Sequence, residues 1–144
     1  MPITFPPKTG QMLLCDFSKG FKEPEMVKPS RPVIVLSGFI PGRSNLATVV
    51  ACSTVPPDIV RGYHYKLPVQ STPKCKHFMG RDTWVKGDMI YTVGYHRLDL
   101  ILMDKNSCGK RIYFDQKLGR EQMNEIYRCV LNGIGMSFLC KHIE

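Results

Sequence analysis

The sequence predicts a mainly β protein that ends in a single α-helix. Two observations lead to this prediction. Short runs of β-branched and aromatic residues recur between Gly and Pro breakers, and the only stretch with helical periodicity lies near the C-terminus. The chain has 144 residues, the usual length of one domain. We therefore expect one domain over residues 1–144, with the strands in residues 8–115 and the helix in residues 119–133.

The first three strands are predicted by apolar runs with clear boundaries. Residues 11–17 follow a Pro-Pro-Lys-Thr-Gly turn, and residues 33–37 form a continuous β-branched run typical of a buried strand. Residues 46–54 form a third strand, which a Pro-Pro pair ends. Alternating aromatic and polar residues at 63–67, and short apolar runs at 89–93 and 110–114, predict the later strands. Many short strands before one helix fit a small SH3-like β-barrel.

The helix is predicted from the spacing of its apolar residues. These recur at offsets of 0, 3, 4, 7, 8 and 11 and form one face of an amphipathic helix: Met123, Ile126, Tyr127, Val130, Leu131 and Ile134. Glu121 and Glu125 near the start agree with the helix dipole, and Gly133 and Gly135 are stop signals.

The composition limits the function classes. Hydrophobic residues make up 43% and charged residues 22% of the chain, which is ordinary for a folded protein. No apolar run approaches the roughly 20 residues of a membrane-spanning helix, and the start lacks a signal-peptide pattern, so we expect a cytoplasmic protein without membrane contact. The six cysteines form no C-x-x-C pair, so we expect no metal site and no cofactor.

The charge points to an anionic partner. Twenty Lys and Arg residues stand against 12 Asp and Glu residues, a formal charge of +8. Residues 43–86 contribute seven cations and two carboxylates, so five of the eight excess charges lie in under a third of the chain. Tyr63, Tyr65, Phe78 and Trp84 lie among these cations. Cations for phosphates and flat rings for unstacked bases predict single-stranded nucleic acid as the ligand.

One pair of sites suits phosphate chemistry. The sequence lacks a Gly-rich phosphate loop, a G-x-S-x-G elbow and an H-E-x-x-H pair. However, Arg31 directly precedes a predicted buried strand, and Ser53 and Thr54 end the next one. If the two strands form a hairpin, these ends lie close together. A guanidinium and a hydroxyl then meet, and together they can bind a phosphate and stabilise a pentavalent phosphorane.

Several segments resemble the MazF/PemK family of toxins from bacterial toxin–antitoxin systems. The resemblance covers most of the chain and rests on residues 10–17, 28–37, 48–54 and 86–89 and on the C-terminal helix. It implies an SH3-like barrel, a homodimer, an antitoxin protein as partner, and an endoribonuclease that cuts single-stranded RNA, including mRNA, without a metal. The catalytic Arg of the family falls on Arg31 and its catalytic hydroxyl on Ser53 or Thr54, while its Asp falls on Asp88.

The resemblance and the basic midsection together predict which residues bind RNA. These are Lys28, Arg43, Arg61, His64, Lys66, Lys86 and Trp84. In the implied mechanism the 2′-hydroxyl of the substrate attacks the adjacent phosphorus, Arg31 neutralises the phosphate oxygens, and the hydroxyl residue orients the phosphate. Asp88 is a candidate base or orienting group, and His64 is a second candidate base because its ordinary pKa lies nearer neutrality.

The sequence leaves two other functions open. One is a CcdB-like toxin that acts through protein contacts, and the other is an SH3-like regulator that binds nucleic acid and leaves it intact. The chain also departs from the family pattern, because Ala51 replaces a usual Pro and the segment from Lys74 to Thr83 is elongated. We therefore expect the RNA sequence preference of this chain to be its own.

Overall fold

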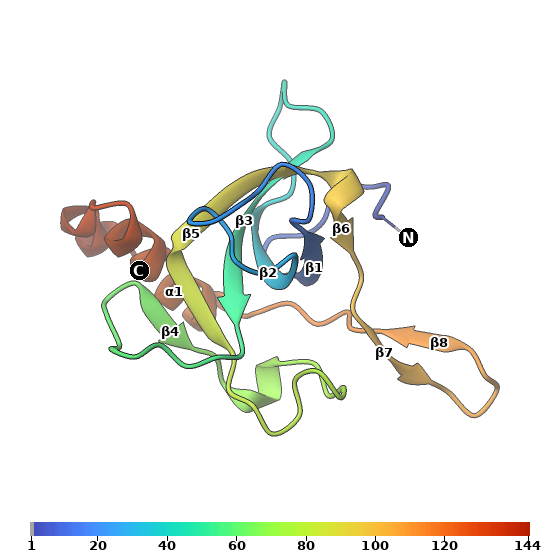
Figure 1. Cartoon of the computed structure of the whole chain (residues 1–144). Helices are drawn as coiled ribbons and strands as arrows, with labels where there is room; N and C mark the ends of the chain where they lie inside the picture. Colours follow the sequence, from blue (N-terminus) through green and yellow to red (C-terminus); the bar gives the residue numbers. More distant parts are fainter. Residues whose placement is uncertain (1) are drawn as a thin grey trace.

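A computed structural model describes residues 2–144 and shows one antiparallel sheet with a helix packed against it (Figure 1). The six strands of the sheet are β1 (Met12–Asp16), β2 (Ser30–Ser37), β3 (Leu46–Ser53), β4 (His64–Lys66), β5 (Trp84–Gly94) and β6 (Leu98–Asp99). Their order is β4-β5-β3-β2-β1-β6. The mainly β prediction and the predicted positions of the first three strands are confirmed.

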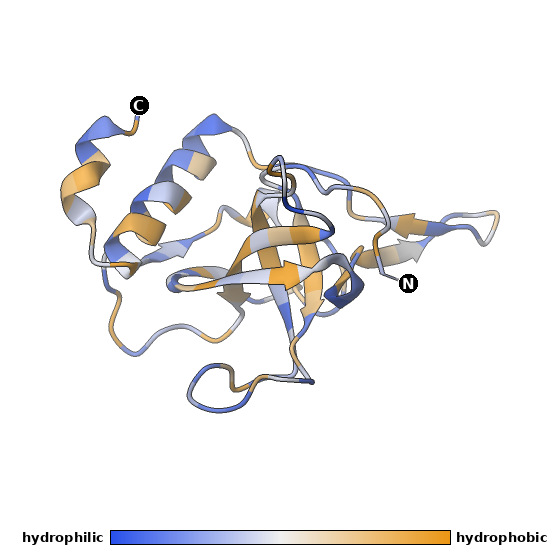
Figure 2. Cartoon of the chain, turned by 90° about the horizontal axis from the view of Figure 1, so that it is seen from above, coloured by the Kyte–Doolittle hydropathy of each residue, from blue (hydrophilic) through white to orange (hydrophobic). Residues whose placement is uncertain are grey.

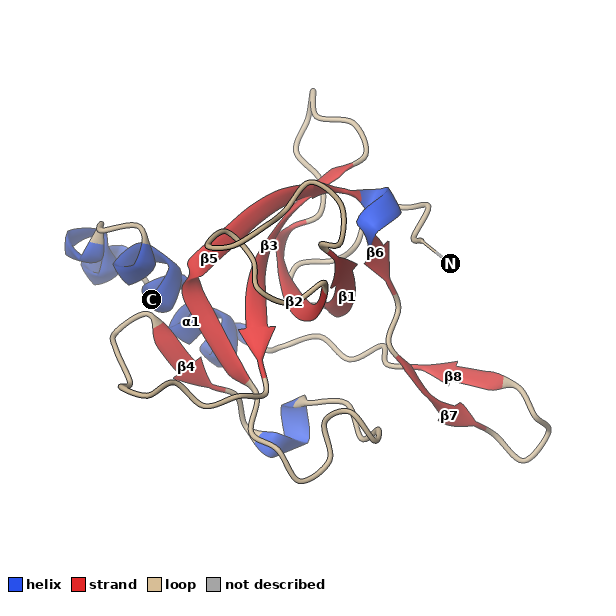
Figure 3. Ribbon diagram, viewed as in Figure 1, coloured by secondary structure: helices blue, strands red, loops and turns tan. Residues whose placement is uncertain are grey.

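Smaller elements surround the sheet (Figure 3). The strands β7 (Leu102–Lys105) and β8 (Arg111–Tyr113) form a separate hairpin that projects from one side, and α1 (Arg120–Gly133) follows them. Short 3₁₀ helices lie at Val69–Ser71, Tyr95–Arg97 and Ser137–His142. The predicted bounds of the helix, 119–133, agree with α1 to within a residue. Gly133 and Gly135 do end this helix, but a 3₁₀ helix that the sequence did not predict follows them.

The closed barrel expected from the sequence is not confirmed. Within residues 2–144 the sheet stays open, because β4 and β6 stand at its two edges and do not pair with each other. Both edge strands are short, three residues in β4 and two in β6, which limits how far they can extend a hydrogen-bonded ladder. The sheet is nevertheless curved, and its long strand β5 bends along its length (Figure 1).

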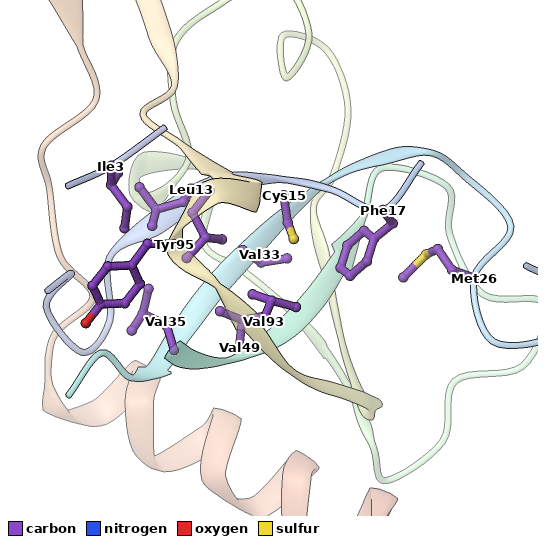
Figure 4. Close-up of a cluster of buried hydrophobic side chains, with 12 residues drawn as sticks. Ile3, Leu13, Cys15, Phe17, Met26, Val33, Val35, Val49, Val93 and Tyr95 are labelled. Atoms are coloured by element: carbon purple, nitrogen blue, oxygen red, sulfur yellow. The ribbon is translucent and has the colours of Figure 1, made fainter. Parts of the chain in front are cut away.

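Hydrophobic residues cover both faces of the central strands. Figure 2 shows the hydrophobic colouring concentrated along these strands and hydrophilic colouring in the outer loops. Val33, Val35 and Val49 belong to the core cluster in Figure 4, whereas Ile34 and Val50 point to the second cluster under α1. Burial on both faces explains why β2 and β3 are continuous β-branched runs rather than alternating ones.

Two glycines let α1 approach β5 directly. A Cβ atom built on Gly133 would lie 2.3 Å from the carbonyl oxygen of Gly87 and 2.5 Å from the amide nitrogen of Asp88. A Cβ atom on Gly87 would lie 2.2 Å from the carbonyl oxygen of Cys129. Both contacts are with backbone, which cannot rotate away, so only glycine permits this crossing. The contact fixes the position of the β5 backbone around Asp88.

We expect the substitution Gly133→Ala to destabilise the fold, because its methyl group forces α1 away from β5. The free energy of unfolding should fall by about 1–3 kcal/mol, as for other overpacked sites, in a urea titration. Gly119→Ala is the control, because a Cβ there meets only the flexible side chain of Gln122 at 3.0 Å, and its cost should not exceed about 1 kcal/mol. Equal losses in the two variants would contradict the close crossing.

Candidate functional site

The register of β2 and β3 directs Arg31 and Ser53 to the same end of the sheet. The ladder between β2 and β3 pairs Val33 with Ala51 and Ile34 with Val50. Continuing this register by two residues sets Arg31 opposite Ser53, and antiparallel partners direct their side chains to the same face of a sheet. Arg31 and Ser53 are 7% and 5% exposed. The hairpin that the sequence predicted therefore brings a guanidinium and a hydroxyl to the same end of the same face.

The Arg31 guanidinium is buried without a carboxylate. Its Nη1 donates to the Sδ atom of Met89 at 3.4 Å, and its Nε is buried with no hydrogen-bond partner. Among the described residues, no Asp or Glu forms an ion pair with it. A thioether is a weak acceptor, and a buried cation without an anion is unfavourable. The group is therefore poised to bind an anion.

A wide bulge in β5 supplies the neighbours of Arg31. The ladder between β3 and β5 pairs Val50 with Ile90 and then Cys52 with Val85. The single residue Ala51 thus faces all of residues 86–89, so the β5 backbone bends away from β3 here. The bulge carries Asp88 and Met89. The Gly87–Gly133 crossing holds this segment from the helix side.

The charge of Asp88 affects the pKa values of two neighbouring side chains, Tyr91 on β5 and His64 on β4. Burial raises the pKa of Tyr91, while the nearby Arg31 lowers it and Asp88 raises it. Burial also lowers the pKa of His64, against an opposing effect of Asp88, and Lys86 adds to the lowering. Because Asp88 influences both Tyr91 and His64, the structure gathers these groups around one charged region. The lowered pKa favours the neutral form of His64.

The two candidate hydroxyls differ in their environment. Ser53 Oγ accepts a hydrogen bond from the amide of Val55 at 3.1 Å and donates to the carbonyl oxygen of the same residue at 3.3 Å. This small turn fixes the Ser53 side chain where β3 ends. Thr54 lies beyond the last paired residue of β3 and is half-buried.

The connection between β1 and β2 covers the Arg31 end of the sheet. The Tyr91 hydroxyl donates to the carbonyl oxygen of Glu25 at 2.5 Å. The centroid of the Phe21 ring lies 5.1 Å from that of Phe17 and 5.5 Å from that of Tyr91. Arg97 donates to the carbonyl oxygen of Lys19 at 2.8 Å. The sequence did not single out these residues or Met89. Apart from the contact between Phe17 and Phe21, the residues in these contacts are 58 to 78 positions apart in the chain, so no local pattern marks them.

Most of the residues predicted to bind RNA gather on β4 and β5. His64 pairs with Lys86 and Lys66 pairs with Trp84, which also pairs with Ser53. The amide of Arg61 donates to Nδ1 of His64 at 3.0 Å. The β4–β5 ladder therefore extends the Arg31–Ser53 site with cations and an aromatic ring.

Two predicted RNA-binding residues come from other parts of the chain. Lys28 is exposed in the connection just before β2, at the same end as Arg31. Arg43 instead lies in the turn between β2 and β3, where its Nη1 donates to Thr48 at 3.0 Å. The β2 strand from Arg31 to Ser37 spans about 20 Å. The structure thus does not bring Arg43 to this site.

The buried cysteines are not nucleophiles. Burial raises the pKa of Cys15 and Cys52 to about 12 and that of Cys129 to about 11, so these thiols are protonated at neutral pH. Within the described part of the chain, no three His, Cys, Asp or Glu side chains cluster as metal ligands do. Nor does any helix among residues 2–144 have the length and apolarity to cross a membrane.

Comparison with known families identifies the relatives of this chain. A profile of the PemK-like, MazF-like toxins of type II toxin–antitoxin systems matches residues 8–132. The chain belongs to this family. It is 27% identical over 149 residues to the putative uncharacterized protein YifN of Escherichia coli K12, covering 93% of this chain and 95% of YifN. It is 30% identical over 141 residues to an uncharacterized protein of Haemophilus influenzae, covering 92% and 93% of the two chains.

Solved structures of PemK/MazF-like proteins share the fold. MazF from Deinococcus radiodurans superposes with a TM-score of 0.60 at 15% identity, over 92% of this chain and all (100%) of that one. A mycobacterial endoribonuclease in complex with its cognate antitoxin superposes with a TM-score of 0.56 at 18% identity, over 90% and 96% of the two chains. At such identities the likeness establishes the fold alone.

We expect the substitution Arg31→Met to stabilise this protein. Methionine keeps most of the side-chain volume beside Met89 and removes a buried, unpaired charge. The free energy of unfolding should rise by about 1–3 kcal/mol in a urea titration, as when buried charges are replaced by apolar groups. In the control Arg128→Met, which removes an exposed ion pair with Glu125, the change should stay within about 0.5 kcal/mol. A less stable Arg31→Met protein would contradict the unpaired state of Arg31.

Proposed function

We propose that this chain is the toxin of a toxin–antitoxin pair and an endoribonuclease that cuts single-stranded RNA without a metal. One observation carries the proposal: among the described residues the buried Arg31 guanidinium pairs with no carboxylate. Continuing the register of β2 and β3 sets the Ser53 hydroxyl opposite it, which supports the same interpretation. A phosphodiester supplies the missing anion, and the cations of the β4–β5 ladder supply contacts for the neighbouring phosphates. The family membership supports the same activity.

The proposed reaction uses the substrate's own nucleophile. The 2′-oxygen forms a bond to the adjacent phosphorus as the bond from phosphorus to the 5′-oxygen breaks. The products are a 2′,3′-cyclic phosphate and a 5′-hydroxyl end. Arg31 neutralises the non-bridging oxygens as negative charge develops, and Ser53 hydrogen-bonds to one of them. DNA lacks the 2′-hydroxyl and stays intact.

Two side chains near the site can handle the protons. The Nδ1 atom of neutral His64 already accepts the amide hydrogen of Arg61, so its Nε2 carries the hydrogen and donates to phosphate rather than acting as a base. Asp88 is exposed on the adjacent bulge, and a carboxylate oxygen can accept a proton. We therefore assign removal of the 2′-hydroxyl proton to Asp88 and phosphate binding to His64. Solvent water protonates the departing 5′-oxygen, and Asp88 returns the proton it accepted to the solvent.

The basic surface of the β4–β5 ladder also suits a protein partner, the antitoxin. A cognate antitoxin with an acidic segment would cover the basic β4–β5 ladder and block the RNA site. The mycobacterial endoribonuclease that shares this fold was solved in complex with its cognate antitoxin. We further propose that the protein is a homodimer acting in the cytoplasm, where mRNA is its substrate, and that its curved sheet corresponds to the SH3-like barrel. A CcdB-like toxin acting through protein contacts has no use for the unpaired Arg31.

We expect Arg31→Ala to abolish RNA cleavage. Wild type should cut mixed-sequence single-stranded RNA in EDTA, and Arg31→Ala should be at least about 10²–10³-fold slower, the usual cost of losing one transition-state donor. Arg128→Ala removes an arginine from the exposed side of α1 and should retain wild-type activity. Intact RNA with wild type would refute the enzyme, and equal cutting by Arg31→Ala would remove Arg31 from the mechanism.

Substitutions of the two candidate hydroxyl residues, Ser53 and Thr54, should have different effects on the rate of RNA cleavage. Ser53 shares the face of Arg31 by register, whereas Thr54 lies past the end of β3. Ser53→Ala should therefore lower kcat by roughly tenfold or more through a lost hydrogen bond to the charged phosphate, and Thr54→Val should change it by less than about threefold. Single-turnover cleavage measures both, and a larger loss in Thr54→Val would reverse the assignment.

A further inference from the structure

The connection between β4 and β5 contains a cavity that the proposed chemistry does not use. It has a volume of about 650 Å³, and residues 69–74 form one wall and residues 78–82 the other. Phe78 and Thr72, which are 3% and 8% exposed, anchor these walls in the protein. Val69 and Met79 also line the cavity but are 69% and 68% exposed. Two large apolar side chains thus stand in solvent at the edge of a hollow of typical ligand size.

The cavity lies beside the Arg31–Ser53 site. The amide of Leu67 donates to the carbonyl oxygen of Thr83 at 2.9 Å and closes the base of the connection. The next residue, Trp84, pairs with both Lys66 and Ser53. In Figure 1 this connection lies just beyond the end of β3, where Ser53 is placed. The cavity therefore opens from a connection whose base adjoins the Ser53 end of β3.

The lining combines three kinds of chemistry. Val69, Phe78 and Met79 offer apolar contacts to a flat ring. The walls also carry hydrogen-bonding groups and cations: Gln70, Asp82, Lys74 and Arg81. Apolar contacts for the ring, an amide and a carboxylate for its polar edge, and cations for the flanking phosphates are what an unstacked nucleotide requires.

We propose that this cavity holds one unstacked nucleobase of the RNA next to the cleaved phosphodiester. The proposal rests on the proposed function and adds to it a subsite that selects sequence. Residues of the elongated segment 74–83 then have a role, since they supply Met79 and Asp82. Asp82 accepts a hydrogen bond from the N–H groups on the edge of the base, although the carboxylate repels the backbone phosphates.

The test compares Met79→Ala and Asp82→Asn with the matched control Met136→Ala, an exposed methionine after α1. Binding is measured by fluorescence anisotropy with short 2′-O-methyl RNA strands, which no 2′-hydroxyl attack can cleave, with one fixed base at each position in turn. Sequencing the RNA ends left by each protein gives an independent measure of preference at the nucleotides beside the cut.

We expect Met79→Ala to reduce the preference at one position by about tenfold, as for other losses of apolar contact in a specific pocket. Asp82→Asn should weaken binding of the preferred base. If Asp82 were only a surface acid, this substitution would instead tighten binding of every RNA by removing repulsion from phosphates. Met136→Ala should match wild type.

The outcomes separate this proposal from the enzymatic one. If Met79→Ala and Asp82→Asn both keep the base preference of wild type, the proposed subsite is wrong, even if wild type cleaves RNA. The cavity would then be assigned to binding of a protein partner. Absence of RNA binding by wild type would overturn it as well. Wild type that binds with a preference lost in the variants, but does not cleave, would support the subsite and refute the endoribonuclease.

Discussion

The site is built around the buried guanidinium of Arg31, with which no carboxylate of the described residues forms an ion pair. Arg31 is the second residue of β2, in a sheet whose central strands are covered on both faces, and its Nη1 donates to the sulfur of Met89. Such a charge lowers stability unless a ligand compensates for it. The fold tolerates it because the rest of the face is well packed. In the proposed function, a bound phosphate pairs with the Arg31 guanidinium and removes this unfavourable free energy. The gain adds to the free energy of binding.

The surroundings of Arg31 follow from how the β5 backbone is shaped. A wide bulge faces Ala51 and carries Asp88 and Met89, and a glycine-to-glycine crossing with α1 holds it in place. The helix is therefore more than a cover for the second core cluster, since its last residue, Gly133, contacts the backbone next to Asp88. This arrangement links helix packing directly to the geometry of the proposed active site.

In the proposed function, the choice of RNA sequence resides in the connections rather than in the sheet. The central strands then position a phosphate-binding pair that is independent of sequence, because phosphates carry no sequence information. The β4–β5 connection adds a cavity with apolar, polar and cationic walls. The β1–β2 connection covers Arg31 through Tyr91 and Glu25. Changes in these two loops can alter which RNA is chosen without disturbing the chemistry.

Local sequence patterns predicted the mainly β class, the first three strands and the helix, and they predicted that Arg31 lies near a hydroxyl of either Ser53 or Thr54. All of these depend on local patterns and on one hairpin, whose register follows from neighbouring strands. Tertiary structure alone decided that the sheet stays open, that Arg31 meets Met89, and that Arg43 lies at the far end. It also placed Tyr91 over the site and formed the cavity between residues 69–74 and 78–82. These features join residues far apart in the chain, and their contacts arise from packing and from an irregular bulge, which no periodic pattern in the sequence encodes.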